Sequence, residues 1–174
     1  MGMKTMEKLA VIPGEHNLKN YEETVAAHEW GSTEKAFSWY ETGKVNIAYE
    51  AIDRHADSQL KDKIALHYYD GSRKEAYTFE QMKHYSNKAA NVIQTKANLQ
   101  KGERIFIFMP RTPELYFSLL GSLKIGAIVG PLFEAFMEGA VYDRLSDSEA
   151  VAIVTTPALL SRIPLEKLPH LKTV

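Results

Sequence analysis

The sequence has no cysteine in its 174 residues, so it can form no disulfide bond and has no thiol for catalysis. This composition fits the reducing environment of the cytoplasm. The net charge of −1 provides no basic field that would attract nucleic acid or an acidic membrane. The first residues, MGMKTMEKLAVIPGEHN, also lack the apolar core of a secretion signal. We therefore expect a cytoplasmic protein with no nucleic-acid or membrane partner.

A long uncharged apolar run is missing as well. The most apolar stretch, residues 105–136, is interrupted by Arg111, Glu114, Lys124 and Glu134. A membrane-spanning helix needs about 20 consecutive, mostly apolar residues with few charges. With 45% hydrophobic and 25% charged residues, the chain has the composition of an ordinary globular domain. The stretch is therefore predicted to be domain core.

The common catalytic and phosphate-binding motifs are scarce. The sequence has no GxGxxG, HExxH or GxSxG pattern. GSLKIGAI (121–128) has two glycines at phosphate-loop spacing, but Ala and Ile occupy the places of Lys and Ser/Thr. DRHAD (53–57) contains metal-ligating residue types, although a polar helix end is the favoured interpretation. Glu134 and Glu138 could serve as acid and base, but a solvated helix N-terminus is the favoured explanation.

Periodicity divides the chain into two parts. Residues 1–46 are predicted to be an irregular, aromatic-rich arm, in which Ser32 is a candidate helix N-cap. Residues 45–54 are predicted to form a helix. Its predicted buried face carries Val45, Ala48, Tyr49 and Ile52. The remainder, residues 47–174, is predicted to be an incomplete α/β subdomain.

A hairpin and a long helix are predicted next. IALHYY (64–69) and KEAYTF (74–79) are typical of strands and flank the turn sequence DGSR. Thr78 and Gln81 form a capping box that starts a helix extending to about Lys96. The predicted buried stripe of this helix comprises Met82, Tyr85, Ala89, Val92 and Ile93.

Short apolar runs then alternate with helical patterns. The run at 105–109 is typical of a strand buried on both faces, and the runs at 127–132 and 150–156 are predicted to be a second and a third strand. The helices between them begin at Pro113, after a capping Thr112, and near Met137. The first helix has Leu115, Leu119 and Leu123 at helical spacing.

This order of elements predicts the fold class. Strand, helix, strand, helix, strand with short connections indicates parallel strands and right-handed crossovers. We therefore predict an α/β fold in which an N-terminal hairpin and helices lead into a βαβαβ parallel-sheet unit. The closing residues, LPHLKTV, are typical of the start of another strand, from which we expect an incomplete domain.

The predicted topology indicates where a ligand would bind. In parallel sheets of this kind, ligands bind beyond the carboxyl ends of the strands. The candidate loops are residues 110–112, 133–136 and 155–164. Arg162 in the third loop is a candidate for binding an anionic ligand, although a lone surface arginine usually has no such role. FSWYETGK (37–44) is a candidate ligand wall, with core packing as the default alternative.

A family resemblance rests on two blocks of sequence. FSWYETGKVNIAYEAIDRH (37–55) resembles the signature near the start of AMP-forming acetyl-CoA synthetases, in which a Trp-aromatic pair precedes a Gly, an Asn and Asp-Arg-His. YTFEQMKHYSNKAANVI and the segment from KGERIFIFMPRTPELYF to SEAVAIVTT are similar to the next blocks of that family. The resemblance extends from about Ile12 and is strongest to a shorter bacterial form. It implies the N-terminal part of the large domain of acyl-adenylate-forming enzymes.

The resemblance also implies an activity for a parent enzyme. That family joins acetate, ATP and coenzyme A through an acetyl-adenylate, with magnesium assisting. Its phosphate loop, adenine motif, ribose-binding Asp and catalytic Lys have no match in residues 1–174. No catalytic residue is therefore assigned, and the chain alone is expected to be inactive and to bind no cofactor tightly.

Part of a coenzyme A site is implied at the strand ends. The family's loop after the second strand borders the pantetheine path, often with Gly-Gly between two aromatic residues. Here Phe133 and Phe136 match the aromatic positions, but Glu134 and Ala135 replace the glycines. The loop after the third strand usually offers arginines to the nucleotide phosphate of coenzyme A. Arg162 is the corresponding candidate, one position away in the alignment.

Two alternatives remain open at this stage. The parent enzyme could instead be a medium-chain acyl-CoA ligase, because the acid pocket lies outside these residues. The chain could also be a stand-alone, non-catalytic interaction domain with Trp30 and Trp39 on its partner surface. If the arm packs on other parts of a larger protein, the isolated chain should expose apolar surface and self-associate.

Overall fold

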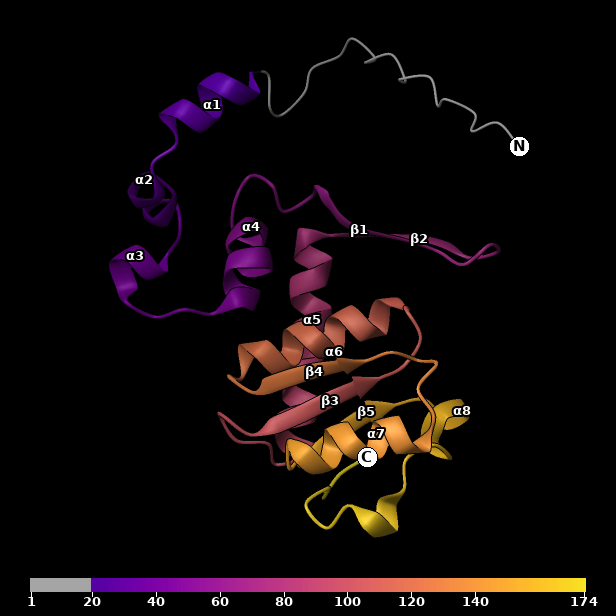
Figure 1. The fold of residues 1–174 in the computed structure, drawn as a ribbon. Helices are drawn as coiled ribbons and strands as arrows, with labels where there is room; N and C mark the ends of the chain where they lie inside the picture. Colours follow the sequence, from indigo (N-terminus) through magenta and orange to yellow (C-terminus); the bar gives the residue numbers. More distant parts are fainter. Residues whose placement is uncertain (1–19) are drawn as a thin grey trace, which may run out of the picture.

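The computed structural model of the protein describes residues 20–174 (Figure 1). Residues 1–19, which hold the start of the arm and Ile12, lie outside the described residues. In chain order, the elements are α1 (Tyr21–Ala27), α2 (Trp30–Lys35), α3 (Trp39–Thr42), η1 (Tyr49–Asp53), α4 (Arg54–Ala56), β1 (Ile64–Tyr69), β2 (Lys74–Thr78), α5 (Phe79–Lys96), β3 (Arg104–Phe108), α6 (Pro113–Lys124), β4 (Ile128–Leu132), α7 (Glu138–Asp147), β5 (Ala152–Thr155), α8 (Pro157–Leu160) and η2 (Leu165–Lys167).

A three-stranded parallel sheet in the order β4-β3-β5 organises the second half of the chain. β3 is central and pairs with β4 from Arg104 opposite Ile128, and with β5 from Ile105 opposite Ala152. α6 connects β3 to β4 and α7 connects β4 to β5, so the predicted βαβαβ unit is confirmed. Thr173 forms an isolated parallel bridge with Ala152, but the strand predicted from LPHLKTV is not formed among the described residues.

Alternating side chains of β3 build two separate cores. Ile105 packs with Ile93 of α5 and with Ala152 of β5 on one face. Phe108 packs with Val141 and Leu145 of α7, which are almost fully buried, on the other face. The period of two follows from the pleat of a strand. Because both faces of β3 are covered, this strand can be apolar from Ile105 to Phe108, as the sequence indicated.

α5 and α6 cross each other (Figure 1), and their backbones approach closely at Gly121. A Cβ atom added at Gly121 would lie 2.7 Å from the main-chain nitrogen of Ala90 and 2.8 Å from the carbonyl oxygen of Ser86. Ser86 and Ser122 are fully buried here, and each hydroxyl donates to a carbonyl one turn earlier in its own helix. Small residues therefore determine which helix faces are buried.

This crossing corrects the predicted helix faces. Met82 and Ile93 of α5 are buried as predicted, but Tyr85 and Val92 are exposed. On α6, Leu115, Leu119 and Leu123 are only half-buried. The buried positions that hydrophobic spacing missed are Ser86, Ala90, Phe117, Ser118, Gly121 and Ser122.

The hairpin and the ends of α5 and α6 agree with the sequence. β1 and β2 pair antiparallel, and the capping box of Thr78 and Gln81 is formed at the start of α5. Thr112 occupies the N-cap position of α6, but its hydroxyl makes no capping hydrogen bond. Gly126 follows the helix with φ of 76°, a conformation that favours glycine.

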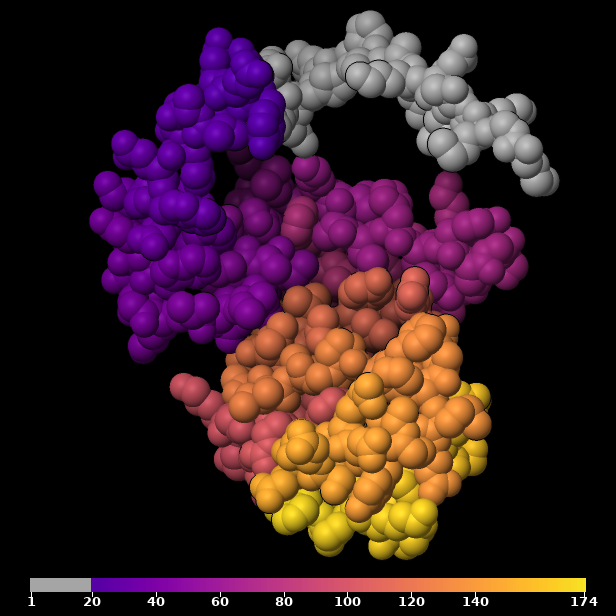
Figure 2. Space-filling view, in the orientation of Figure 1, coloured from indigo at the N-terminus to yellow at the C-terminus, as the bar shows by residue number. Residues whose placement is uncertain are grey.

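The arm differs from the prediction. Residues 20–46 contain the three short helices α1, α2 and α3 rather than irregular chain. Ser32 lies inside α2, whose N-cap is Glu29, so the predicted cap is wrong. In Figure 2 the arm lies along one side of the molecule, beside the α/β part. The boundary proposed between arm and subdomain stays a prediction.

The helix predicted over residues 45–54 is present from Ile47 onward, but its middle is a π-helical turn, η1, that continues into α4. Ala48 and Ile52 are buried as predicted, whereas Val45 and Tyr49 are exposed. Glu50 is buried instead. The wider π-helical turn rotates side chains away from the positions that an α-helical spacing predicts.

Among residues 20–174, no helix combines the length and apolarity that crossing a bilayer requires.

Candidate functional site

The three predicted site loops gather at one edge of the parallel sheet. They follow the carboxyl ends of β3, β4 and β5, which lie side by side in the sheet. A pocket of about 260 Å³ lies at the first two loops, lined by Met109, Arg111, Tyr116, Leu132 and Phe133 among others. The pocket thus combines one cation, Arg111, and one carboxylate, Glu134, with aromatic and apolar side chains at the edge where such sheets bind ligands.

The loop after β4 is a tight turn. The main-chain N–H of Phe136 donates to the carbonyl oxygen of Phe133 at 2.9 Å. Neither Glu134 nor Ala135 has a positive φ. The backbone conformation of the turn therefore does not require glycine at these two positions. Glycine there would only allow a ligand to approach the backbone more closely.

The two aromatic residues of this turn have different surroundings. Phe136 is partly buried against the cluster around Phe108, and the guanidinium carbon of Arg144 lies 4.2 Å from its ring centroid. Phe133 is 54% exposed and lines the pocket. The two ring centroids are 5.9 Å apart with planes at 89°. Phe136 thus anchors the turn, while the ring of Phe133 is accessible.

Arg162 reaches the same turn from the segment after β5. Its Nη1 donates to the carbonyl oxygen of Glu134 at 2.8 Å and approaches that of Phe136 at 3.4 Å. The structure therefore brings the three candidate residues, Phe133, Phe136 and Arg162, into one cluster. Arg162 makes these hydrogen bonds to main-chain carbonyl oxygens.

Two further residues line the pocket. Arg111 lies in the first predicted loop, residues 110–112, while Tyr116 lies in α6 and was not singled out from the sequence. Within the described residues, the buried hydroxyls of Thr112, Thr155 and Thr156 have no hydrogen-bond partner. A buried hydroxyl without a partner costs free energy. A ligand group that hydrogen-bonds to one of these hydroxyls would remove that cost.

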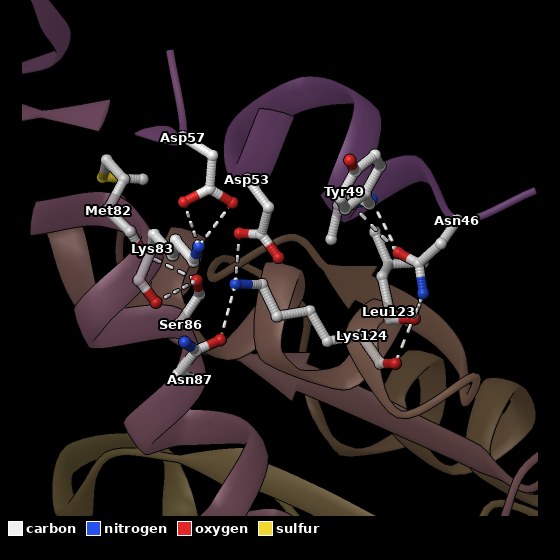
Figure 3. A network of polar contacts seen from close by, with 11 residues as sticks. Asn46, Tyr49, Asp53, Asp57, Met82, Lys83, Ser86, Asn87, Leu123 and Lys124 are labelled. Atoms are coloured by element: carbon white, nitrogen blue, oxygen red, sulfur yellow. Dashed lines mark hydrogen bonds and ion pairs between the residues drawn. The ribbon is translucent and has the colours of Figure 1, made fainter. Parts of the chain in front are cut away.

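The DRHAD segment holds helices together. Asp53 pairs with Lys124 Nζ at 2.6 Å, and Lys124 also donates to Asn87 at 2.7 Å (Figure 3). Asp57 pairs with Lys83 of α5 at 2.6 Å, and this hydrogen bond raises the pKa of Lys83. In residues 20–174 no group of three or more His, Cys, Asp or Glu side chains is arranged to hold a metal ion.

Other residues of the 37–55 block fasten the arm. The Asn46 side chain accepts from the N–H groups of Ala48 and Tyr49 and donates to the carbonyls of Leu123 and Lys124 (Figure 3). A groove of about 510 Å³ lies beside this network. Asp53 and Lys124 in its wall bind each other, which indicates a structural role.

The aromatic segment 37–44 packs on the π-helical turn. The rings of Phe37 and Trp39 are stacked with centroids 4.1 Å apart, and the guanidinium carbon of Arg54 lies 5.0 Å from the Phe37 ring centroid. Buried Glu50 accepts hydrogen bonds from the main-chain N–H and hydroxyl of Ser38 and pairs with Arg54 at 3.0 Å. These contacts favour packing over a ligand wall.

The two candidate acid–base carboxylates are both exposed. Glu138 in the first turn of α7 binds Lys167 Nζ at 2.7 Å, and this hydrogen bond raises the pKa of Lys167. Glu134 lies in the turn whose carbonyl is bound by Arg162. This arrangement favours the solvated helix N-terminus over an acid–base pair.

Polar contacts at the hairpin shift two further pKa values. Main-chain N–H groups of Arg73 and Ser72 donate to Asp70 and lower the pKa of that carboxyl. The Tyr77 hydroxyl donates to Glu75 at 2.6 Å, which raises the pKa of Tyr77 to about 12. These contacts stabilise the hairpin, and Arg73 also approaches Glu114 in the first turn of α6 at 4.0 Å.

Comparisons with known proteins agree on one family. The family model described as AMP-binding enzyme matches residues 52–174. Acetyl-coenzyme A synthetase of Bacillus subtilis (strain 168) is 63% identical over 169 residues, which is 97% of this chain and 30% of the relative. Acetyl-coenzyme A synthetase of Helicobacter acinonychis (strain Sheeba) is 35% identical over 121 residues, 68% of this chain and 18% of the relative. The chain thus spans less than a third of the length of these relatives.

Solved structures share the fold. The crystal structure of Brucella canis acyl-CoA synthetase matches with a TM-score of 0.75 and 27% identity, over 88% of this chain and 28% of that one. The anthranilate CoA ligase AuaEII, solved in complex with anthranoyl-AMP, matches with a TM-score of 0.62 and 20% identity, over 73% of this chain and 24% of that one. At that identity, the second match concerns the fold alone.

Proposed function

The chain belongs to the AMP-binding enzyme family, and from this premise we propose that it is the N-terminal part of an acetate–CoA ligase. The complete ligase converts acetate, ATP and coenzyme A to acetyl-CoA, AMP and pyrophosphate through an acetyl-adenylate. The observation that carries this proposal is the 63% identity to an acetyl-coenzyme A synthetase over 97% of the chain. The alignment covers nearly every residue and therefore includes the 37–55 block, whose side chains attach the arm to the rest of the chain.

We propose that this part of the ligase contributes to the coenzyme A side of the site. The exposed ring of Phe133 beside a pocket that contains Arg111 and Glu134 fits a ligand with both an apolar chain and polar groups. Coenzyme A supplies the thiol that accepts the acetyl group. ATP and magnesium would be held by residues beyond this chain, because the resembling family's phosphate loop has no match in residues 1–174.

A cytoplasmic location belongs to the same proposal. The chain has no cysteine and an ordinary globular composition, both of which fit a reducing compartment. Fractionation of the source cells, with the protein detected by an antibody to this chain, tests the location.

The test of the activity is acetate-dependent exchange of labelled pyrophosphate into ATP by the full-length protein, followed by acetyl-CoA formation on addition of coenzyme A. Butyrate is compared with acetate in both assays. Preference for acetate supports the proposal, and preference for butyrate indicates a medium-chain acyl-CoA ligase. The 174-residue chain alone serves as the control and is expected to catalyse no exchange.

The interaction-domain alternative has one supporting observation. The arm exposes apolar side chains that include Trp30, which is 76% exposed, and Val45, which is 67% exposed. We propose that they contact other parts of the ligase's large domain. A full-length protein without ligase activity that retains a stable protein partner through this arm would favour the alternative.

A further inference from the structure

Arg162 connects two loops at the carboxyl edge of the sheet. It follows α8, and its Nη1 lies 2.8 Å from the carbonyl oxygen of Glu134 and 3.4 Å from that of Phe136. A guanidinium is a rigid planar fork, so a donor shared between two carbonyls fixes the direction of the whole group. The arginine therefore holds the turn after β4 from a segment that is remote in sequence.

The same turn is held at a second point. The ring of Phe136 packs on the cluster around Phe108, and Arg144 of α7 lies over it at 4.2 Å. The N–H of Phe136 closes the turn on the carbonyl of Phe133. With its carbonyls and its second aromatic ring engaged, the turn has one exposed aromatic side chain, that of Phe133, which lines the strand-end pocket.

We propose that Arg162 is a positioning residue that orders the Phe133–Phe136 turn for binding of the pantetheine arm of coenzyme A, and that it does not bind the nucleotide phosphate. This inference rests on the proposed function. Its physical basis is that Nη1 satisfies main-chain acceptors that otherwise have no donor in the turn. Without Arg162, the turn loses the link to the segment after β5 and Phe133 loses its fixed position.

Dephospho-coenzyme A separates the two roles, because it keeps the pantetheine arm but lacks the 3′-phosphate. The full-length enzyme is compared with Arg162→Ala and Arg162→Lys. Arg104→Ala is the matched control, because Arg104 also donates to two main-chain carbonyls, those of Ser148 and Glu149, but from the start of β3 at the opposite edge of the sheet. Each variant is assayed for KM and kcat with both thiols, for pyrophosphate exchange without thiol, and for melting temperature.

The positioning role predicts a specific pattern. Arg162→Ala raises the KM about tenfold for coenzyme A and by the same factor, within about twofold, for dephospho-coenzyme A. Pyrophosphate exchange changes by less than about twofold, because adenylate formation does not use the thiol site. Arg162→Lys recovers part of the loss equally for both thiols, since lysine keeps a donor without the planar fork. Arg104→Ala leaves both KM values unchanged.

Three results would overturn the proposal. A loss about tenfold greater for coenzyme A than for dephospho-coenzyme A would make Arg162 a phosphate ligand. Equal losses in pyrophosphate exchange and thiol kinetics, or the same KM change in Arg104→Ala, would make its role a general one in stability. Unchanged kinetics in Arg162→Ala would show that the contact has no function. Wild-type enzyme without exchange or acetyl-CoA formation would instead refute the proposed function.

Discussion

The pair of Asp53 and Lys124 is expected to stabilise the attachment of the π-helical turn to the α5–α6 crossing. The two side chains are 16% and 10% exposed, and Lys124 Nζ lies 2.6 Å from Asp53 and 2.7 Å from Asn87. Lys124→Met would leave the Asp53 carboxylate without its cation in a largely desolvated place. Removing one partner of a fully buried pair costs about 3–5 kcal/mol.

Because both side chains keep some solvent contact, we expect Lys124→Met to lower the free energy of unfolding by an amount at or below the lower limit of this range, about 2–3 kcal/mol. Asp53→Asn should cost less, about 1–2 kcal/mol, because Lys124 keeps Asn87 as a partner. The double variant should cost less than the sum of the two single variants by about 1–2 kcal/mol, since the pair is broken only once.

Urea unfolding of the 174-residue chain, followed by far-ultraviolet circular dichroism, measures these differences at constant m-value. Lys83→Met is the control, because Lys83 meets Asp57 at the same 2.6 Å but with side chains 31% and 59% exposed. Lys83→Met should lower the free energy of unfolding by no more than about 1 kcal/mol. Equal costs for Lys124→Met and Lys83→Met, or additive costs in the double variant, would refute the reasoning from burial.

Three further predictions follow from other contacts. Gly121→Ala should destabilise the chain by about 1–3 kcal/mol in urea unfolding, because its Cβ would lie 2.7 Å from the main chain of Ala90; an unchanged midpoint would contradict the close crossing. The raised pKa of Tyr77 contributes stability that is complete below about pH 10 and is lost as pH rises through about 12. Absorbance titration should therefore show that Tyr77→Phe removes the last-titrating phenol, and an unchanged end of the curve would contradict the hydrogen bond to Glu75. The isolated chain should self-associate in light scattering through its exposed arm, and Trp30→Glu should reduce this; a strictly monomeric chain at high concentration would contradict it.

The sheet was predictable because its signal is local. Short apolar runs separated by helical spacing gave the strands around Ile105, Ile128 and Ala152 and the order of connections. Capping residues such as Thr78 and Gln81 located the start of α5. These signals depend on neighbours within a few residues, which a single sequence displays directly.

The buried helix faces were less predictable because another helix determines them. At the α5–α6 crossing, Gly121, Ser86 and Ala90 are buried since small side chains allow the backbones to approach. Hydrophobic spacing favours large residues and therefore selected Tyr85 and Val92 instead, which are exposed. The π-helical turn at Tyr49–Asp53 likewise has no signature in α-helical periodicity.

The sequence predicted that the candidate loops lie at the same end of the sheet, but not which contacts join them. The rule that ligands bind at the carboxyl ends of parallel strands selected the loops that contain Phe133 and Arg162. That Arg162 donates to the carbonyl of Glu134 depends on folding across two crossovers, which no local pattern encodes. Arg111 lies in the predicted loop 110–112, whereas Tyr116 lies in α6, outside the predicted loops.

The most direct test of the central proposal is product analysis of the full-length protein incubated with acetate, ATP, magnesium and coenzyme A. An acetate–CoA ligase of this family is predicted to release AMP and acetyl-CoA in equal amounts, and only when acetate is present. Release of ADP instead of AMP, or no AMP with acetate at any protein concentration, would contradict the proposed function.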